Sequence, residues 1–556
     1  MKIINRTAEP QDVLKWLRAG KNPVVAKALA ARNANSQAQL LEVEALKGAQ
    51  EMAKILADAI DNNKHLLIVA DYDCDGATAC AIGVRGLRMF GASVSFIVPD
   101  RNKHGYGLSP AISELACAEL PHPDYIITVD NGIASHAGVD RAKELGVPVL
   151  VTDHHLPGET QPDAEVIVNP NQHGCTFPSK SLAGCGVIWY VMWALQQEMA
   201  SRGVLPDGQG VFELLPLVAV GTVADVVRLD DNNRILVQMG LERIRNGKGF
   251  PGIDALALAA GRDPRKLSTS DIGFGIGPRI NAAGRLADMS TGIECLLTDS
   301  VSVAENYAQQ LNTLNNERKS IEKDMAVEAG NDLVTRVSDN RYTVTLTGEN
   351  WHAGVVGIVA GRIKERVWRP TFAMAKDESG QYKGSGRSIP GFHLRDALDL
   401  VDRRHPGLLI KFGGHAMAAG LTLRENGIEE FEQAFEEVAH ELINPEILNQ
   451  EVFVDGSLPA QHMTLGTIEA IKDEVWGQGF PEPAFLDTFD VLEARMIGKD
   501  REHLKMTLQK DGVVFDAVHF RYQGTMPVGQ VKALFKLDAN TWNGKTKLQI
   551  LVDSFV

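Results

Sequence analysis

The sequence predicts an α/β protein in which a doubly wound parallel sheet is joined by a long helix to a second α/β domain and then to a C-terminal β-barrel. Three features predict this fold: short apolar runs that alternate with helix-length segments, a long stretch almost free of glycine and proline, and a β-rich C-terminal part with many turn residues. A chain of 556 residues exceeds the size of one hydrophobic core, which stops growing near about 250–300 residues. We therefore expect several domains.

The first 300 residues divide into two parts. Two amphipathic stretches within residues 1–64 predict an N-terminal helical segment. Residues 65–300 predict the doubly wound domain, because short apolar or β-branched runs there are separated by helix-length segments. The runs are HLLIVA, VSFIVP, YIITVD, VPVLVTD and EVIVNP. In such sheets ligands bind beyond the carboxyl ends of the strands, so a site is expected at that edge.

The remaining residues predict three further elements. Residues 301–338 predict a connecting long helix, since glycine and proline are absent before Gly330. Residues 339–445 predict the second α/β domain, which carries two glycine-rich segments, and residues 446–556 predict a small barrel. A coiled-coil dimer arm is the alternative for the long helix, but its apolar spacing is irregular and we expect a monomer.

Composition excludes several classes of protein. The net charge of −15 argues against coating nucleic acid by bulk attraction, so any contact with DNA must be a local groove. Six scattered cysteines without a CxxC pair indicate neither a zinc knuckle nor a disulfide framework. No run of about 18 apolar residues and no apolar signal core occur, so we expect a cytoplasmic protein without a membrane partner.

Three carboxylates follow the first predicted strand at a spacing of two residues. Asp71, Asp73 and Asp75 would point to one side of an extended backbone, and clustered like charges need a cation. An EF-hand loop shares the pattern DxDxDG. It is disfavoured because Ile82 stands where the bidentate glutamate belongs and because a strand precedes the motif.

Other segments add ligand-type side chains. Asp130 ends the run YIITVD, Asp153-His154-His155 ends VPVLVTD, and Asp225 lies in an apolar segment where a lone carboxylate is costly to bury. Each could be a turn former or helix cap by itself. Together they predict a site for Mn²⁺ or Mg²⁺, with manganese favoured by the imidazoles. Two such ions suit phosphoester hydrolysis.

The motifs DYDCDGAT, VDNG, DHH and TVADVV resemble, in order, those of the DHH phosphoesterases, and KGSGRS with FGGHAMAAG is similar to their DHHA1 domain. Further similarity in NPVVAKALAARN, PDRNKHGYGL, AGCGV, GPRINAAGR and WHAGVVGIVAGR covers most of the chain and points to the RecJ group of that family. The resemblance implies a 5′→3′ exonuclease specific for single-stranded DNA that acts in recombination and repair, with an OB-fold as the barrel. It also implies a single-strand-binding protein and a DNA helicase as partners.

The same resemblance assigns roles at the predicted site. It implies five metal ligands: Asp73, Asp75, Asp130, His154 and Asp225. Asp71 and Asp153 are then carboxylates that orient ligands and set the histidine tautomer. His155 is expected to contact the scissile phosphate or to assist proton transfer.

Glycines, hydroxyls and one guanidinium in KGSGRS suit a terminal phosphate, with Ser385, Arg387 and His415 as the expected contacts. A plain surface turn is the alternative. Arg101, Tyr106, Arg279 and Arg285 are further candidates for DNA binding, because arginine pairs with phosphate and an aromatic ring can stack on a base. By the resemblance, a passage too narrow for a duplex would explain the single-strand preference.

The barrel offers basic and aromatic candidates, although alternating apolar residues are more often barrel core. The basic ones are Arg495, Lys499, Arg501 and Lys505, and the aromatic ones are Phe515, Phe520 and Tyr522.

Three rival functions remain. The first is another DHH enzyme that acts on oligonucleotides, a cyclic dinucleotide or polyphosphate, but such enzymes generally lack a trailing barrel. The second is an inactive binding module, which would lack metal ligands. A dehydrogenase or ATPase would need GxGxxG or GxxxxGK[ST] in a supporting context, and neither occurs.

Overall fold

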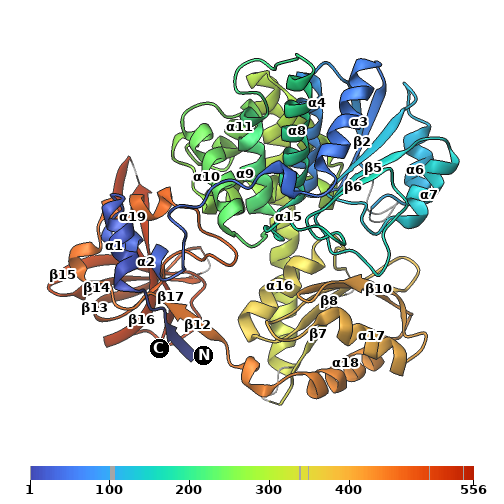
Figure 1. The fold of residues 1–556 in the computed structure, drawn as a ribbon. Helices are drawn as coiled ribbons and strands as arrows, with labels where there is room; N and C mark the ends of the chain where they lie inside the picture. Colours follow the sequence, from blue (N-terminus) through green and yellow to red (C-terminus); the bar gives the residue numbers. More distant parts are fainter. Residues whose placement is uncertain (1, 100–106, 337–339, 349, 500, 543) are drawn as a thin grey trace. The chain divides into compact units, whose positions relative to one another are not determined.

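The computed structural model describes residues 2–99, 107–336, 340–348, 350–499, 501–542 and 544–556. It forms two compact units (Figure 1). One contains Asn5–Asn312 with Phe453–Val556, and the other contains Met1–Ile4 with Thr313–Val452. Each unit is described by itself below. Among the described residues, no helix combines the length and apolar character that crossing a bilayer requires.

A five-stranded parallel sheet organises the first unit and confirms the predicted fold class. Its strand order is β3-β2-β4-β5-β6. The strands are β2 (His65–Ala70), β3 (Ser93–Ile97), β4 (Tyr125–Val129), β5 (Val149–Thr152) and β6 (Val166–Val168). Every residue of β2 is buried, as expected for a central strand covered on both faces.

Helices cover both faces of this sheet (Figure 1). One face carries α3 (Ala49–Asp61), α4 (Cys74–Met89) and α8 (Gly184–Ser201), and the other carries α6 (Pro110–Cys117) and α7 (His136–Glu144). On the second face, Val69 and Val149 pack in one apolar core with Ile112 of α6 and Val139 of α7. This double cover explains why β2, β4 and β5 consist almost entirely of apolar or β-branched residues.

A helical layer packs beside α4 and α8 and closes one side of the predicted site. Within it, α12, a π-helical turn called η4 and α13 follow one another without interruption. The layer comprises α9 (Leu215–Ala224), α10 (Asp231–Arg245), α11 (Pro251–Ala259), α12 (Thr269–Asp271), η4 (Ile272–Ile276), α13 (Gly277–Leu286) and α14 (Ser290–Leu297).

The predicted long helix is α15 (Val301–Arg336), which is 36 residues long. Its buried positions recur every three or four residues, but several are polar. Arg318 and Glu322 pair at 2.7 Å, and Glu322 also pairs with Arg362 at 2.6 Å. Polar residues at buried positions explain why the apolar spacing is irregular in the sequence. The buried positions are Ala304, Ala308, Leu311, Asn315, Arg318, Glu322, Met325, Ala329 and Leu333.

The second unit contains a mixed five-stranded sheet in the order β10-β11-β9-β8-β7, where only β7 and β8 pair in parallel. Its strands are β7 (Val344–Gly348), β8 (Thr371–Lys376), β9 (Tyr382–Arg387), β10 (Leu409–Gly414) and β11 (Ala418–Leu423), and its helices are α16 (Val356–Val367), α17 (Leu394–Arg404) and α18 (Ile428–Leu442). It is the predicted second α/β domain.

The C-terminal strands close into the predicted barrel in the order β13-β14-β15-β17-β16. They are β13 (Phe485–Ile497), β14 (His503–Lys510), β15 (Val513–His519), β16 (Gly529–Trp542) and β17 (Lys545–Phe555). Val24 of α2 (Pro23–Ala30) belongs to the barrel's apolar core, and Arg32 donates to both carboxylate oxygens of Asp455 at 2.7 and 3.0 Å. The N-terminal helices thus pack on two different structures: α2 packs on the barrel, whereas α3 covers the parallel sheet.

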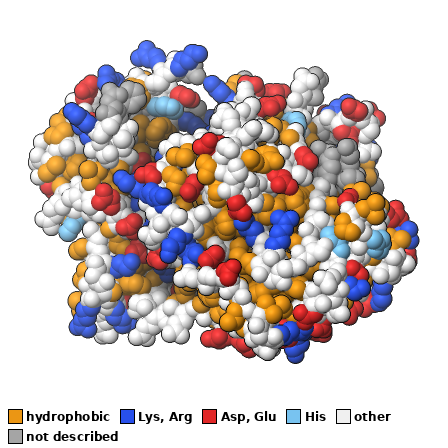
Figure 2. Space-filling view, turned by 90° about the horizontal axis from the view of Figure 1, so that it is seen from above, with side chains coloured by type: hydrophobic (Ala, Val, Ile, Leu, Met, Phe, Trp, Pro, Cys, Tyr) orange, Lys and Arg blue, Asp and Glu red, His pale blue; other side chains and the backbone are white. Residues whose placement is uncertain are grey.

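Charge is distributed as the composition suggests. Figure 2 shows Lys and Arg side chains scattered among Asp and Glu side chains on the face it draws. Together with the net charge of −15, this distribution agrees with local rather than bulk attraction of an anionic partner.

Candidate metal centre

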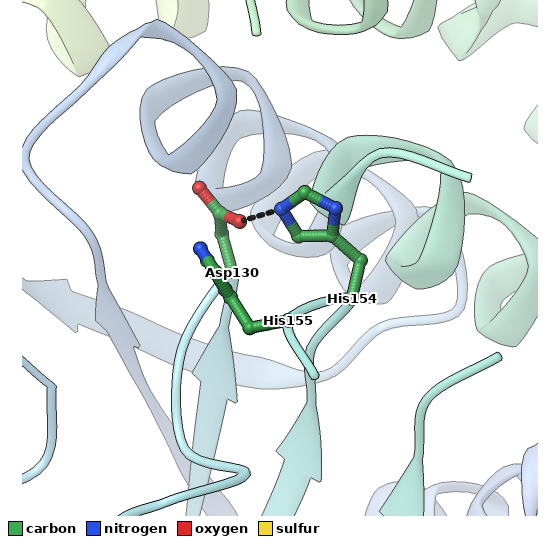
Figure 3. Close-up of side chains that lie close together, drawn as sticks. All are labelled: Asp130, His154 and His155. Atoms are coloured by element: carbon green, nitrogen blue, oxygen red, sulfur yellow. Dashed lines mark ion pairs between the residues drawn. The ribbon is translucent and has the colours of Figure 1, made fainter. Parts of the chain in front are cut away.

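The carboxyl ends of three adjacent strands, with the ends of two helices, bring together four of the five predicted metal ligands, Asp75, Asp130, His154 and Asp225, whereas Asp73 is in neither of the two groups described below. Asp71 follows β2, Asp130 follows β4, and Asp153-His154-His155 follow β5, while Asp225 caps the C-terminus of α9. Two groups have ligand atoms within 4.8 Å of one another: Asp130, His154 and His155 (Figure 3), and Asp75, His154 and Asp225. His154 belongs to both groups and therefore lies at the centre of the cluster.

Asp73 and Asp75 are held by helix N-termini. Asp73 is the N-cap of α4, and its Oδ1 accepts from the Gly76 amide at 3.0 Å. Asp75 lies in the first turn of α4 and accepts from two amides at the start of α8, Gly184 at 2.6 Å and Cys185 at 2.9 Å. These contacts orient the Asp75 carboxylate, because the positive end of α8 points at it.

Asp130 is a buried carboxylate with an unsatisfied oxygen. Its backbone has φ of 62°, an uncommon conformation that directs the side chain from the end of β4. The side chain is 2% exposed, and Oδ1 makes no hydrogen bond among the described residues. His154 Nε2 lies 3.1 Å from that oxygen without hydrogen-bond geometry (Figure 3) and 3.6 Å from Asp225 Oδ2. A buried carboxylate oxygen that makes no hydrogen bond and lies beside an imidazole is the arrangement expected of a metal ligand.

The electrostatics of the cluster also favour a cation. Burial, reinforced by the charge of Asp73, raises the pKa of Asp71 to about 8. Burial and the neighbouring carboxylates likewise raise the pKa of Asp130 and Asp225 well above the usual range. Carboxylates that repel one another in a buried site ionise together only if a positive ion offsets the repulsion. The donor set of oxygens and one or two imidazoles fits a divalent cation such as Mn²⁺.

Asp153 acts on the histidines rather than joining the cluster. Its Oδ1 accepts from His155 Nδ1 at 2.7 Å, and its Oδ2 accepts from the Ile133 amide at 2.9 Å. Burial opposes ionisation, but the hydrogen bond and charge of His155 lower the pKa of Asp153 to about 2. Burial likewise opposes charge on His155, and Asp153 raises the pKa of His155 to about 9. The pair fixes the orientation of the His155 ring.

One motif, GPRINAAGR, supplies two residues that support this site and that no pattern in the sequence assigns to it. Asn281 of α13 accepts from the Cys74 amide through Oδ1 at 2.8 Å and so braces the loop of carboxylates. A Cβ on Gly284 would lie 1.9 Å from the carbonyl oxygen of Tyr72, so α13 approaches the loop as closely as glycine allows. The motif GPRINAAGR was the available signal, but it was interpreted as DNA binding.

Replacing Asn281 with leucine should therefore leave the Cys74 amide without its acceptor. We expect kcat to fall roughly tenfold to a hundredfold, since supporting residues of metal sites typically contribute that much. The measurement is kcat on a single-stranded oligomer together with the melting temperature. Replacement by aspartate, which keeps an acceptor at this position, should lose less, and equal losses would contradict the bracing role.

The predicted phosphate pocket lies in the second unit. Arg387 of β9 donates to Ser385 Oγ at 3.0 Å and to the Gly386 carbonyl at 2.8 Å. The first turn of α16 lies against both side chains, because a Cβ on Gly357 would be 2.9 Å from Ser385 Oγ and 3.0 Å from Arg387 Nη2. His415 follows β10, and its amide donates to the carbonyl of Ala418, the residue paired with Arg387. The three predicted contacts thus lie in one part of the sheet.

The other four predicted DNA contacts are Arg279 and Arg285, which the structure describes, and Arg101 and Tyr106, which it does not. Arg279 is buried and donates to the carbonyls of Gly275 at 2.7 Å and Ala259 at 3.0 Å and to Asn312 Oδ1 at 3.1 Å. Its burial and these bonds indicate a structural role, so we correct its assignment as a phosphate contact. Arg285 lies in the last turn of α13. Arg101 and Tyr106 lie outside the described residues.

The aromatic candidates of the barrel differ in how far they are exposed. Phe515 is 6% exposed and belongs to the barrel core, so its prediction as a stacking ring is wrong and the core alternative is right. Tyr522 packs against the same core and donates to the Thr525 carbonyl. Phe520 is 56% exposed. Among the basic residues, Arg495 and Lys505 are cross-strand partners on β13 and β14.

Comparison with known proteins places the chain in a class. Residues 65–222 match the model of the DHH family N-terminal domain, residues 339–441 match the DHHA1 domain, and residues 454–554 match the RecJ OB domain. The parallel sheet, its strand-end cluster and this order of domains define a member of the DHH class.

Full-length similarity narrows the class to one family. The chain is 45% identical to the single-stranded-DNA-specific exonuclease RecJ of Salmonella typhimurium, over 98% of this chain and 97% of that one, and 44% identical to the Escherichia coli exonuclease of the same name, over 96% and 95%. The crystal structure of Thermus thermophilus RecJ in complex with Mn²⁺ matches with a TM-score of 0.81 at 30% identity, covering 100% of this chain and 79% of that one. The chain belongs to the RecJ family.

Proposed function

We propose that the protein is a metal-dependent exonuclease that hydrolyses single-stranded DNA from its 5′ end by a two-metal mechanism. One observation carries the proposal. In the described part of the chain, Asp130 has a buried oxygen that makes no hydrogen bond. This oxygen lies 3.1 Å from His154 Nε2, in a cluster of carboxylates whose pKa values are raised. Membership of the RecJ family supplies the substrate class, because the similar Salmonella and Escherichia proteins are single-stranded-DNA-specific exonucleases.

The metal ions would be held by Asp73, Asp75, Asp130, His154 and Asp225, and would supply Lewis-acid activation and charge neutralisation at the phosphoryl group. The chain's own groups prepare the site for them. The start of α8 orients Asp75 through two amides. Burial lowers the pKa of His154, with the charge of His155 adding to this effect, which keeps the ring neutral and able to ligate. Asp71 adds a further carboxylate beside this set.

His155 is assigned to the scissile phosphate. Asp153 accepts from Nδ1 at 2.7 Å and raises the pKa of the ring, so a cationic imidazole would stand beside the phosphodiester. A positively charged donor there stabilises charge that develops on the phosphoryl oxygens during hydrolysis. Asp153 is then a positioning residue that acts through His155.

The function is tested with the full-length protein and a single-stranded oligomer in the presence of Mn²⁺, Mg²⁺ or EDTA. The proposal expects release of nucleotides that EDTA abolishes and that either ion restores, with a duplex of the same sequence resistant. Cleavage of dinucleotides or polyphosphate with the oligomer left intact would instead favour the other DHH chemistries. No turnover of any of these substrates would favour an inactive binding module.

The pocket formed by Ser385, Arg387 and His415 is proposed to bind the 5′ phosphate of the strand. Replacing Arg387 with alanine should raise KM for a 5′-phosphorylated oligomer about tenfold, because it removes one charge-assisted contact of roughly 1.5–3 kcal/mol. A 5′-dephosphorylated oligomer should respond much less to the same replacement. The assignment of the pocket would be contradicted if the two oligomers had equal KM values with the wild type and also with the variant.

Several finer assignments belong to the same proposal. Imidazole ligation favours manganese over magnesium as the resident ion. We also propose a monomer that acts in the cytoplasm in recombination and repair, with a single-strand-binding protein and a helicase as partners. Membership of the RecJ family is the ground for these assignments.

A further inference from the structure

The π-helical turn η4 carries an exposed phenyl ring. Phe274 is 81% exposed, although the residues at both ends of the turn, Ile272 and Ile276, are fully buried. Large aromatic side chains contribute most of their binding energy in cores and interfaces. A solvent-exposed ring on an ordered helical turn is therefore a candidate contact for a ligand. π-helical turns are also frequent at functional sites.

The sequence of the turn explains why the ring faces solvent. A Cβ on Gly273 would lie 3.6 Å from Val223 Cγ1, and a Cβ on Gly275 would lie 3.3 Å from the Ala260 side chain. The two glycines therefore bring the backbone of the turn close to α9 and to the end of α11. Phe274, between them, is the residue that points outward.

The turn is also anchored. The guanidinium of Arg279 donates to the Gly275 carbonyl at 2.7 Å, to the Ala259 carbonyl at 3.0 Å and to Asn312 Oδ1 at 3.1 Å. These bonds tie η4 to α11 and to α15. The buried arginine thus holds the turn that presents Phe274, which makes the ring a preorganised contact surface.

The turn packs on the helix that carries Asp225. Gly273 packs on Val223, and a Cβ on Gly277 would lie 3.0 Å from Ala224 Cβ, so residues on both sides of Phe274 contact the last turn of α9. Asp225, a proposed metal ligand, directly follows that turn. The helix that continues from η4 braces the carboxylate loop through Asn281 and the Cys74 amide. Phe274 therefore stands on a turn that packs against the end of the helix that carries a proposed metal ligand.

We propose that Phe274 stacks on a nucleobase of the single-stranded substrate and thereby positions the strand at the metal centre. This inference rests on the proposed function. A base of single-stranded nucleic acid offers an apolar face that an exposed ring can cover, whereas the bases of a duplex are already stacked. The contact would tolerate any base, since every base has a π-face.

The test is steady-state kinetics on 5′-phosphorylated single-stranded oligomers with wild type, Phe274→Ala and Phe274→Trp. We expect Phe274→Ala to raise KM roughly tenfold with kcat nearly unchanged, because stacking on an aromatic ring contributes about 1–3 kcal/mol per base. Phe274→Trp should retain the wild-type KM. Melting temperatures should not change, because the ring contributes little to packing.

A second set of measurements identifies the nucleobase that Phe274 contacts. In each oligomer, one nucleotide is replaced by an abasic residue. At the position that Phe274 contacts, this replacement should raise the KM of the wild type about as much as the alanine substitution does. The same oligomer should not raise the KM of Phe274→Ala further. Leu205→Ala is the matched control, because this 76% exposed leucine lies beyond the C-terminus of α8, whose other end contacts Asp75. Leu205→Ala should behave as wild type.

The inference and the proposed function fail in different ways. A wild type that degrades no single strand would refute the function. If the wild type is active, two results would refute the stacking role alone. One is an unchanged KM for Phe274→Ala. The other is an increase in KM from the alanine substitution that adds to the increase from the abasic residue at every position.

Discussion

Replacing Asp130 with alanine is expected to reduce hydrolysis of single-stranded DNA at least about a thousandfold, which corresponds to roughly 4 kcal/mol of transition-state stabilisation. Asp130 is 2% exposed, leaves one oxygen without a hydrogen bond among the described residues and lies 3.1 Å from His154 Nε2, which is the arrangement expected of the proposed metal ligand. The same substitution should remove most of the rise in melting temperature that Mn²⁺ causes in the wild type, because an ion that binds only the folded state stabilises it by mass action.

Asp254 provides a matched control. It too has a buried Oδ1 without a hydrogen bond and a pKa raised by burial, but it lies on α11, and no carboxylate contributes to its shift. Asp254→Ala should keep both the activity and the response to Mn²⁺. An Asp130→Ala variant that still degrades DNA at a rate near that of the wild type would contradict the metal centre as described.

Replacing Gly184 with alanine should reduce kcat about a hundredfold. The new Cβ would lie 2.5 Å from Asp130 Oδ1 and 2.7 Å from Asp130 Cβ, and the amide of the same residue donates to Asp75 Oδ2 at 2.6 Å. One or both carboxylates must move, and a displacement of about 1 Å in a catalytic constellation can cost that factor. The check is kcat together with the Mn²⁺ concentration that gives half-maximal activity, which should rise.

Gly466→Ala is the corresponding control, because a Cβ on this glycine in the first turn of α19 (Leu465–Asp473) would meet nothing closer than Thr464 Oγ1 at 3.9 Å outside the adjacent residues and the backbone of its own helix, among the residues that the structure describes. It should leave activity unchanged and stability equal or slightly higher, as expected for a helical glycine. If Gly184→Ala were fully active with an unchanged requirement for Mn²⁺, the close approach of α8 to the cluster would have no catalytic significance.

Much of the site could be predicted from the sequence because parallel strands end at a common edge. The run HLLIVA became β2 with the predicted bounds. The carboxylate Asp75 after it, Asp130 at the end of YIITVD and His154 after VPVLVTD meet where the topology requires. Strand-end positions follow from hydrophobic pattern alone. The arrangement of His154 between two carboxylates does not, because it depends on the left-handed conformation of Asp130.

What could not be predicted depends on close approach between distant segments. Nothing in the pattern around Gly184 shows that its α-carbon lies against Asp130, and Asn281 is 207 residues from the amide that it accepts from. Arg279 looked like a phosphate contact because arginine pairs with phosphate, yet its donors are used by carbonyls of neighbouring helices. Charge type predicts what a side chain can bind, and only packing decides whether it is available.

The most direct test of the proposed function follows one oligomer labelled with different fluorophores at its two ends, incubated with Mn²⁺ and either the wild type or Asp130→Ala. The account predicts that the wild type releases the 5′ label first as short products, while the 3′ label stays on progressively shorter strands, and that EDTA or the substitution stops both. Release of the 3′ label first, cleavage within the strand, or undiminished degradation by Asp130→Ala would contradict it.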